Sequence, residues 1–263
     1  MTESGRKKKK ARVMAQTQIA PGIYDLRLRW EDAKLARPGQ FVMVYPECAA
    51  TLLPRPISIC ETDPEGAQLR LVYRVAGAGT KEFSALGPGE EVSILGPIGN
   101  GYDLTGLSGK EVLLLGGGIG IPPMLELAKT LEGKARSVTA VLGYRDDHLF
   151  LAADLEDYAQ VLVATEDGSL GTKGNVLDAI RVNEVTADAV CACGPMPMLR
   201  AIKEYALGLD IPAYLSLEER MACGVGACLG CVTKTAKEDP HSHVNNARVC
   251  TEGPVFECRE VLL

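Results

Sequence analysis

The sequence CGVGACLGC runs from Cys223 to Cys231, and Cys250 follows after a further eighteen residues. The first three cysteines have the spacing C-x4-C-x2-C, which is typical of the ligands of a plant-type [2Fe–2S] cluster. Structural zinc is usually held by two separate C-x2-C pairs, whereas here only Cys228 and Cys231 form one. The alternative is a glycine-rich loop with incidental thiols, but four cysteines in this order rarely arise by accident. We therefore expect Cys223, Cys228, Cys231 and Cys250 to hold two irons.

Three glycines in this stretch allow the chain to wrap around such a cluster. Gly224, Gly226 and Gly230 have no Cβ atom, so the backbone can adopt positive φ and approach the metal closely. The amide N–H groups of the loop can then point at sulfur, which tunes a reduction potential. A two-iron cluster passes one electron at a time, and the rest of the chain should therefore contain the sites that give and take electrons.

Composition limits the other possibilities. The 263 residues suffice for two modest domains and a small appendage, and 46% hydrophobic content indicates packed cores. A net charge of −6 and a pI of about 5.3 argue against nucleic-acid binding. No apolar segment follows the basic run Arg6–Arg12, so residues 1–12 are expected to form a solvated tail and not a secretory signal. No apolar run approaches the ~18 residues of a membrane span. The nine cysteines, without an export signal, indicate a cytoplasmic chain with reduced thiols.

Short alternating segments with frequent turns dominate residues 13–105. Tyr24, Leu26, Leu28 and Trp30 alternate with charged residues, which is the period-two pattern of a strand. Further strands are expected at residues 41–45, 57–60, 69–75 and 91–95. Strands this short, separated by prolines and glycines and with little helix between them, predict an antiparallel β-barrel or sandwich.

Two segments of this region carry residues suited to a flavin. In Arg55-Pro56-Ile57-Ser58, an arginine fixed by the following proline can pair with a diphosphate, and the serine can hydrogen-bond the flavin. The second segment, Val72-Tyr73-Arg74, precedes Gly77-Ala78-Gly79-Thr80 and a helix expected at residues 81–86, whose free N–H groups can seat a pyrophosphate. Taken alone, such an arginine is usually a surface charge, and the tyrosine is as readily an ordinary strand residue. The order of the segments therefore carries the prediction.

Strands and helices alternate between residues 106 and 212. The apolar run Glu111–Leu115 ends in the glycine turn Gly116–Pro123, which leads into a helix expected at residues 124–131. The turn contains Gly117, Gly118 and Gly120, but the third glycine of the dinucleotide fingerprint is replaced, so a tight turn without a ligand stays open. Further strands are expected at 137–142, 161–164 and 189–193, and helices at 151–158, 176–182 and 197–207. This alternation predicts a parallel sheet with its ligand at the carboxyl ends of the strands.

One such strand end carries Cys193-Gly194-Pro195, where Cys193 is well placed to contact a nicotinamide. The residue that would read the adenosine ribose is less clear. Asp146 and Asp147 follow the second strand of the unit, but Arg145 precedes them and would suit a 2′-phosphate. The choice between NAD and NADP therefore stays open at this point.

Together these motifs resemble the electron-transfer subunits of type B dihydroorotate dehydrogenases, within the ferredoxin–NADP reductase superfamily. The resemblance covers nearly the whole chain after the basic run. It implies an antiparallel FAD-binding β-barrel at residues 13–105, an NAD-binding α/β domain at 106–212 and a small C-terminal [2Fe–2S] domain at 213–263. Its carriers are RPIS (55–58), VYRVAGAGT (72–80), GGGIGIPP (116–123), CGP (193–195) and the four cysteines. The implied FAD contacts are Arg55, Pro56, Ile57, Ser58, Val72, Tyr73, Arg74, Gly79 and Thr80.

The resemblance also implies a function. The family partner is an FMN-containing catalytic subunit that oxidises dihydroorotate to orotate in pyrimidine biosynthesis, within a heterotetramer of two copies of each chain. Electrons would run from FMN through the cluster and FAD to NAD⁺, because NAD⁺ takes a hydride, the cluster takes single electrons and FAD handles both. The acid and base for dihydroorotate would belong to the partner, so no catalytic side chain is expected here.

Some features fall outside this scheme, and two other functions stay open. The loop from Lys234 to Val249 contains His241 and His243, which we expect to be solvated, and Cys258 lies outside the quartet. One alternative is an NAD(P)H-linked flavin subunit of a hydrogenase or transhydrogenase complex, which nucleotide preference and the partner would distinguish. The other is a non-catalytic zinc-binding adaptor, which would be colourless, whereas a flavin with an iron–sulfur cluster is brown-yellow.

Overall fold

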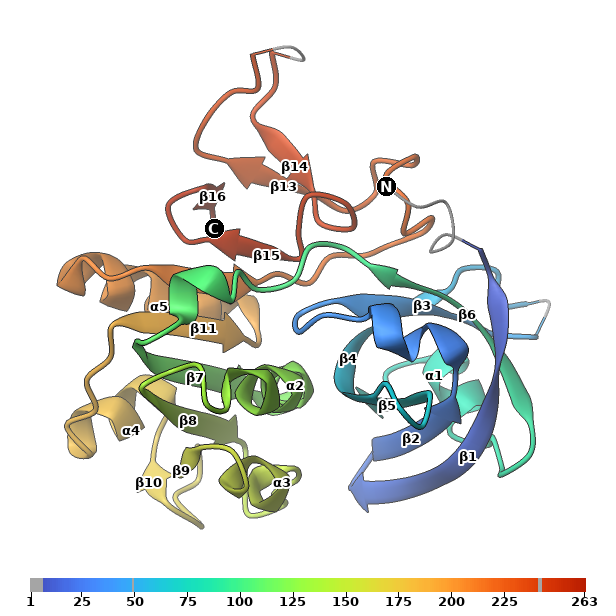
Figure 1. Ribbon diagram of the computed structural model, residues 1–263, viewed down its shortest axis with the longest axis horizontal. Helices are drawn as coiled ribbons and strands as arrows, with labels where there is room; N and C mark the ends of the chain where they lie inside the picture. Colours follow the sequence, from blue (N-terminus) through green and yellow to red (C-terminus); the bar gives the residue numbers. More distant parts are fainter. Residues whose placement is uncertain (1–6, 49, 241–242) are drawn as a thin grey trace.

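The computed structural model describes residues 7–48, 50–240 and 243–263, which form three parts (Figure 1). A β-barrel lies on one side, an α/β unit lies on the other, and a small sheet lies above the junction between them. Arg6 of the expected tail and His241 of the expected loop lie outside the described residues. Within the described ranges, no helix is long and apolar enough to cross a membrane.

The first part is a closed antiparallel barrel with the strand order β1-β2-β5-β4-β3-β6. Alternate residues of β2, such as Leu26 and Leu28, are buried inside it, as the period-two pattern predicts. The strands are β1 (Lys9–Ala20), β2 (Ile23–Arg29), β3 (Phe41–Tyr45), β4 (Arg55–Asp63), β5 (Gln68–Arg74) and β6 (Glu91–Ile98). The helical segments are η2 (Glu31–Leu35) and α1 (Ala78–Phe83).

The basic run is not a solvated tail throughout, which corrects the expectation for residues 1–12. Strand β1 begins at Lys9, and its first residues pair with β6. Three lysines have partners that are distant in sequence. Lys8 lies 4.7 Å above the ring of Tyr45, Lys9 Nζ lies 2.6 Å from Asp32 Oδ2, and Lys10 Nζ lies 2.8 Å from a carboxylate oxygen of the exposed Glu47. The local sequence does not reveal these partners, so the run looked like a free tail.

The second part is a seven-stranded sheet with the order β10-β9-β8-β7-β11-β12-β15. The central strand β7 is buried on both faces, because its adjacent residues Leu113 and Leu114 point to opposite faces and enter two different cores. Residues of α4 and α5 lie in the first core and residues of α2 and α3 in the second. The strands are β7 (Glu111–Gly117), β8 (Ser137–Tyr144), β9 (Gln160–Thr165), β10 (Thr172–Lys173), β11 (Ala189–Cys193), β12 (Ala213–Ser216) and β15 (Val255–Glu257). The helices are η3 (Thr105–Leu107), η4 (Gly118–Gly120), α2 (Pro122–Leu131), α3 (Ala152–Glu156), α4 (Val176–Val182) and α5 (Met196–Leu209).

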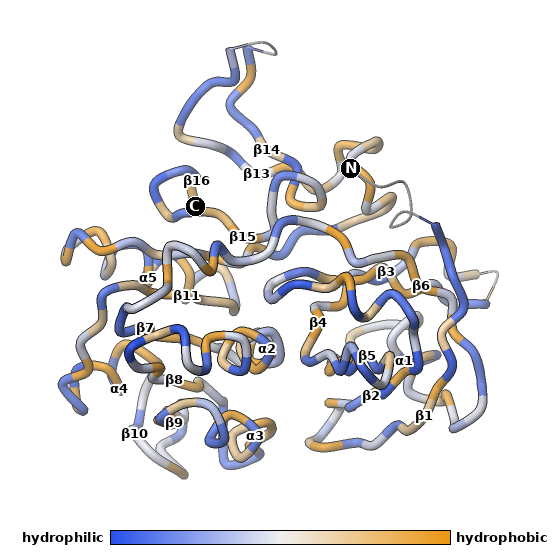
Figure 2. The backbone as a smooth tube through the Cα atoms, in the orientation of Figure 1, coloured by the Kyte–Doolittle hydropathy of each residue, from blue (hydrophilic) through white to orange (hydrophobic). Residues whose placement is uncertain are grey.

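The C-terminal residues do not all separate from this sheet. Strand β12 pairs in parallel with β11, and β15 pairs antiparallel with β12. The expected boundary after residue 212 therefore cuts these two strands away from the sheet to which they belong. The remaining strands, β13 (Val232–Thr235), β14 (Asn246–Arg248) and β16 (Val261–Leu262), form a small separate sheet. The described residues between β13 and β14, 236–240 and 243–245, project from the molecule and are mostly hydrophilic (Figure 2).

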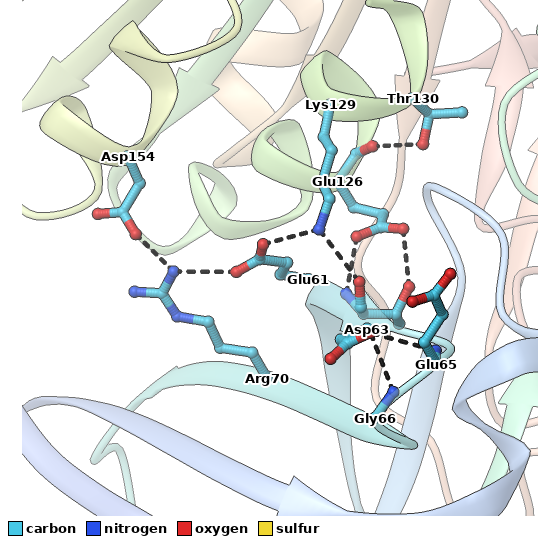
Figure 3. Close-up of polar contacts among 10 residues, drawn as sticks. Glu61, Asp63, Glu65, Gly66, Arg70, Glu126, Lys129, Thr130 and Asp154 are labelled. Atoms are coloured by element: carbon cyan, nitrogen blue, oxygen red, sulfur yellow. Dashed lines mark hydrogen bonds and ion pairs between the residues drawn. The ribbon is translucent and has the colours of Figure 1, made fainter.

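A network of ion pairs joins the barrel to the α/β unit (Figure 3). Arg70 of β5 lies at its centre, with Nη1 3.3 Å from Glu61 Oε2 of β4 and 2.5 Å from Asp154 Oδ1 of α3. Glu61 also accepts a hydrogen bond from Lys129 of α2, at 2.9 Å. Charges of both signs from both units therefore meet at this interface, which fixes the barrel against the nucleotide-binding unit.

Candidate functional site

Strands β4 and β5 separate at the residues expected to contact a flavin. Their antiparallel ladder begins at Ile59 and Leu71. On one side of the opening, residues 55–58 pair only with β3, and on the other side residues 72–74 pair only with β2. Two backbone edges with free hydrogen-bonding groups therefore face each other. Such edges must find other partners, and the polar edge of a flavin ring supplies donors and acceptors of this kind.

A cavity of about 930 Å³ lies beside this opening. This is the size range of ligand sites in proteins. Its walls come from the start of β4, the start of α1, the β3–β4 loop and the segment after β12. Among the residues that line it are Arg55, Pro56, Ser58, Ala78, Ser216 and Glu218.

Arg55 lies directly against the glycine-containing turn that follows β5. A Cβ atom added to Gly79 would lie 2.9 Å from the Cζ atom of Arg55, so the guanidinium would have to move if this residue had a side chain. The hydroxyl of Thr80 accepts hydrogen bonds from the N–H groups of Ala76 and Gly77, at 2.9 and 3.2 Å, and fixes the turn. Helix α1 starts at residue 78 and not at 81 as expected, because this bonding closes the first turn earlier.

The guanidinium of Arg55 is free to bind an anion. Among the described residues, no carboxylate lies within 4.0 Å of it, and its one hydrogen-bond partner is the carbonyl oxygen of Leu53. A half-buried cation without a counter-ion, at the edge of a cavity, is suited to a diphosphate.

The side chain of Tyr73 is not among those that line the cavity. Its ring is 2% exposed inside the barrel, where it stacks on Tyr24 at a centroid distance of 5.9 Å. Its hydroxyl donates a hydrogen bond to Gln16 Oε1 at 2.8 Å, and burial raises its pKa. Only the backbone of Tyr73 therefore lies at the opening, whereas the Arg74 side chain is exposed and its charge acts on Glu218, which lines the cavity.

The glycine turn after β7 packs tightly against the end of β11. A Cβ atom on Gly120 would lie 2.3 Å from the carbonyl oxygen of Cys193, and one on Gly117 would lie 2.4 Å from Met198 Sδ. Gly118 has a φ of +52°, and a Cβ atom on Gly194 would also lie 2.9 Å from Met198 Sδ. The structure thus brings the expected nucleotide residues together at the carboxyl ends of two neighbouring parallel strands, with Pro195 beginning the turn into α5.

Cys193 links this turn to the cavity. Its thiol is 4% exposed, and burial together with the charge of Glu218 raises its pKa to about 12, against a weaker opposite effect of Ser216. Both of these neighbours line the cavity. The thiol is therefore neutral at physiological pH. Sequence reasoning missed Glu218 and Ser216, because only the pairing of β12 with β11 brings them to the site.

Side-chain interactions join the four expected iron ligands in two pairs, Cys223 with Cys228 and Cys231 with Cys250, and the charge of Cys223 also acts on Cys250. Among the described residues, no three of these sulfurs lie within 4.8 Å of one another. Tetrahedral zinc at ~2.3 Å from each ligand would bring all four sulfurs to within ~3.8 Å. The pairing fits two metal ions that each take two thiolates, as in a [2Fe–2S] cluster.

Backbone amides point at the first pair, as the glycine content predicts. Although burial opposes it, hydrogen bonds from the N–H groups of Val225 and Cys228, each 3.4 Å from Cys223 Sγ, lower the pKa of Cys223 to about 6. The N–H group of Gly230 donates to Cys228 Sγ at 3.4 Å. The loop therefore stabilises thiolates, the form in which cysteine binds metal. In the second pair, burial and the neighbouring Cys231 raise the pKa of Cys250 to about 12.

The cysteine loop packs directly on the barrel. Gly224 has a φ of +69°, and a Cβ atom there would lie 2.6 Å from Met43 Cγ of β3. The amide of Asn100 donates hydrogen bonds to the carbonyl oxygens of Thr251 and Glu252, at 3.2 and 3.1 Å. These contacts fix the position of the four sulfurs relative to the barrel.

Comparison with known proteins agrees with this geometry. Residues 218–262 match the model of the iron-sulfur cluster binding domain of dihydroorotate dehydrogenase B. The chain is 46% identical over 255 residues to the dihydroorotate dehydrogenase B (NAD⁺) electron transfer subunit of Streptococcus pneumoniae R6, covering 96% of this chain and 97% of the relative. It is 42% identical over 261 residues to the corresponding subunit of a Geobacillus species, covering 98% and 99%. The chain belongs to the family of dihydroorotate dehydrogenase B electron transfer subunits.

Solved structures extend the comparison to the fold. The NADH-dependent reduced ferredoxin-NADP oxidoreductase, described for flavin-based electron bifurcation, is 28% identical with a TM-score of 0.85 and covers 96% of this chain and 89% of its own. A ferredoxin NADP⁺ reductase from Neisseria gonorrhoeae, at 13% identity and a TM-score of 0.67, covers 82% and 96% and shares the fold alone.

Family membership confirms several expectations. The chain is an oxidoreductase subunit with the predicted barrel, parallel α/β sheet and iron–sulfur region. FAD, an iron–sulfur cluster and NAD are its cofactors, and its process is electron transfer to NAD⁺ in pyrimidine biosynthesis. The matching iron–sulfur model excludes the zinc adaptor.

Proposed function

We propose that this chain carries electrons from the FMN of a dihydroorotate dehydrogenase catalytic subunit to NAD⁺. The observation that supports this most is that three regions lie close to one barrel. They are the cysteine pairs, the opening between β4 and β5 beside the cavity, and the glycine turn after β7. FAD supplies the chemistry that links single-electron carriers to a hydride acceptor. The chain's own residues bind and orient the groups that exchange electrons.

We assign the flavin to the opening between β4 and β5. Arg55 neutralises the diphosphate, and the turn held by Thr80 lies beside it, with Gly79 leaving room for the guanidinium. Pro56, Ile57 and Ser58 offer one backbone edge to the ring, and Val72, Tyr73 and Arg74 offer the other.

We assign NAD⁺ to the glycine turn and the end of β11. Gly117, Gly118 and Gly120 let the dinucleotide approach the backbone, and Cys193, Gly194 and Pro195 bound the nicotinamide side. Cys223, Cys228, Cys231 and Cys250 hold the irons, two thiols to each.

The catalytic subunit is the expected partner of this chain. We propose a heterotetramer with two FMN-containing catalytic subunits and two copies of this chain, located in the cytoplasm. Leu229, which is 62% exposed in the cysteine loop beside the exposed Cys228, offers an apolar contact for the catalytic subunit. The alternative, an NAD(P)H-linked subunit of another complex, is supported by the bifurcating oxidoreductase at TM-score 0.85, but its 28% identity is well below 46%.

The experiment is Cys228→Ser in the assembled complex, with Cys48→Ser as the control because that thiol is also exposed and lies outside the quartet. Serine offers a hard oxygen where iron prefers a soft thiolate, so we expect the variant to lose iron. It should keep NADH-dependent reduction of a two-electron dye, because the flavin and nucleotide residues are intact.

Electron transfer from dihydroorotate to NAD⁺ should fall to background in Cys228→Ser and stay unchanged in Cys48→Ser. Gel filtration verifies that both variants still assemble. An assembled, iron-free complex that reduces NAD⁺ with dihydroorotate at the wild-type rate would rule out the cysteine loop as the route.

A further inference from the structure

Arg248 lies at the end of β14, two residues before Cys250, and its guanidinium reaches across to the cysteine loop. Its Nη1 atom donates a hydrogen bond to the carbonyl oxygen of Gly226, at 3.3 Å. Gly226 stands between Cys223 and Cys228 and has a φ of +79°. The arginine therefore connects the strand that carries the fourth cysteine to the loop that carries the first three.

Glu252 holds this guanidinium in place from the other side of Cys250. Its Oε1 atom accepts a hydrogen bond from Arg248 Nε at 3.0 Å, and Arg248 Nη2 forms an ion pair with the same oxygen. The backbone N–H of Arg248 donates to Glu252 as well. An arginine and a carboxylate, with two side-chain bonds and one backbone bond, thus form a rigid pair around the fourth cysteine.

The two charges of this pair stand beside the expected ligands. Arg248 and Glu252 are each two residues from Cys250, and Arg248 Nη1 bonds Gly226 of the cysteine loop, where an added Cβ atom would lie 3.5 Å from it. A permanent positive charge therefore lies next to the sulfur atoms that would bind the irons, and a negative charge lies next to it.

We propose that the Arg248–Glu252 pair sets the reduction potential of the cluster held by the four cysteines. The proposal rests on the function proposed above. A cluster gains a negative charge when it accepts an electron, so a nearby cation favours the reduced form and a nearby anion disfavours it. The guanidinium raises the potential, and the carboxylate restrains it and holds the guanidinium in position. Both are positioning residues, since neither binds iron.

Opposite single substitutions separate this electrostatic role from a structural one. Arg248→Gln removes the cation and leaves the carboxylate, so the potential should fall. Glu252→Gln removes the anion and leaves the cation, so the potential should rise. Arg259→Gln is the matched control, because Arg259 is 42% exposed against 41% for Arg248 but pairs with Glu257 and Asp210. Arg248→Lys keeps the charge and should stay nearer the wild-type potential than Arg248→Gln.

The measurement is a redox titration of the purified holoprotein, followed by the electron paramagnetic resonance signal of the reduced cluster, with iron quantified in each variant. We expect at least a threefold change in the preference for the reduced form in each direction, which for a one-electron couple is about 30 mV. The control should show no shift.

Shifts of the same sign in Arg248→Gln and Glu252→Gln, or none in either, would overturn the proposal, because a purely structural contact has no reason to change sign with charge. If Arg248→Gln loses its iron, Glu252→Gln decides alone, and an unchanged or lower potential there counts against the proposal. A wild-type protein without a cluster would refute the function proposed above. A wild-type protein that holds its cluster, with the same reduction potential in every variant, would refute this inference only.

Discussion

Arg70→Met would remove the central charge of the interface between the barrel and the α/β unit. The Arg70 side chain is only 10% exposed, and its Nε and Nη2 atoms lie 3.0 and 2.9 Å from Asp25 Oδ2. Asp25 is itself 9% exposed, and its other oxygen has no hydrogen-bond partner among the described residues. Methionine fills a similar space, so the main effect is a buried carboxylate left with only the half-exposed Arg27, at 3.6 Å.

Breaking a buried ion pair by removing one partner costs about 3–5 kcal/mol. Arg27→Met is the matched control, because Arg27 Nη2 lies 3.6 Å from the same Asp25 oxygen but its side chain is 50% exposed. An exposed pair of this kind contributes about 0–1 kcal/mol. The two substitutions therefore remove the same residue type from the same carboxylate, and they differ in burial and in geometry.

Trp30 provides the readout, because it is the only tryptophan of the chain and is 3% exposed in the barrel core. Urea unfolding followed by its fluorescence should give a free energy of unfolding lower by about 3–5 kcal/mol for Arg70→Met. Adding Asp25→Asn to Arg70→Met should recover part of the lost free energy of unfolding, since it removes the buried negative charge of Asp25. A loss below about 1 kcal/mol, equal to that of Arg27→Met, would refute the assignment of the network as a buried clamp.

Three further changes test the interface, the flavin site and the glycine turn. Burial raises the pKa of Glu126 above its ordinary 4.5, so the stability of the wild type should fall as the pH rises through the raised pKa. Glu126→Gln, which can still bond Thr62, should match the wild-type stability below pH 4.5 and exceed it above. A stability difference between the two proteins that is largest in acid would contradict this. Gly79→Ala should displace the Arg55 guanidinium and lower FAD retention while the iron content stays unchanged. A flavin content at the wild-type level would contradict the assignment of FAD to this site. Gly120→Ala, with a Cβ atom 2.3 Å from a β11 carbonyl oxygen, should weaken NAD⁺ binding about tenfold in a titration of the holoprotein, where unaltered affinity would count against the turn.

The elements that sequence predicts well depend on short-range patterns. Alternation of apolar and charged residues located β2 to within one residue, and the apolar run Glu111–Leu115 located β7, which the structure buries on both faces. The cysteine spacing identified the four thiols that the structure brings together as two pairs. In each case the signal lies within a few residues of the element that it describes.

The features that sequence did not predict depend on partners far away in the chain. The start of β1 is held by contacts of its lysines with η2 and with the end of β3, so the basic run alone suggested a tail. The inward direction of Tyr73 is set by its position in the barrel ladder, where it pairs with Tyr24. Strand β12 joins the sheet only because β11 lies beside it, and a boundary drawn from composition could not include that pairing.

One segment of the chain connects all three binding regions. Strand β12 pairs with β11, which ends at Cys193 beside the glycine turn. Its last residue and the five that follow it, 216–221, line the cavity together with the start of β4, and Cys223 comes two residues later. Cys223 in turn begins the loop that packs on Met43, whose ladder partner is Pro56 of the flavin opening. One short stretch of backbone, anchored by strand pairing at one end and by packing on the barrel at the other, therefore runs past the nucleotide, flavin and iron regions and fixes their order.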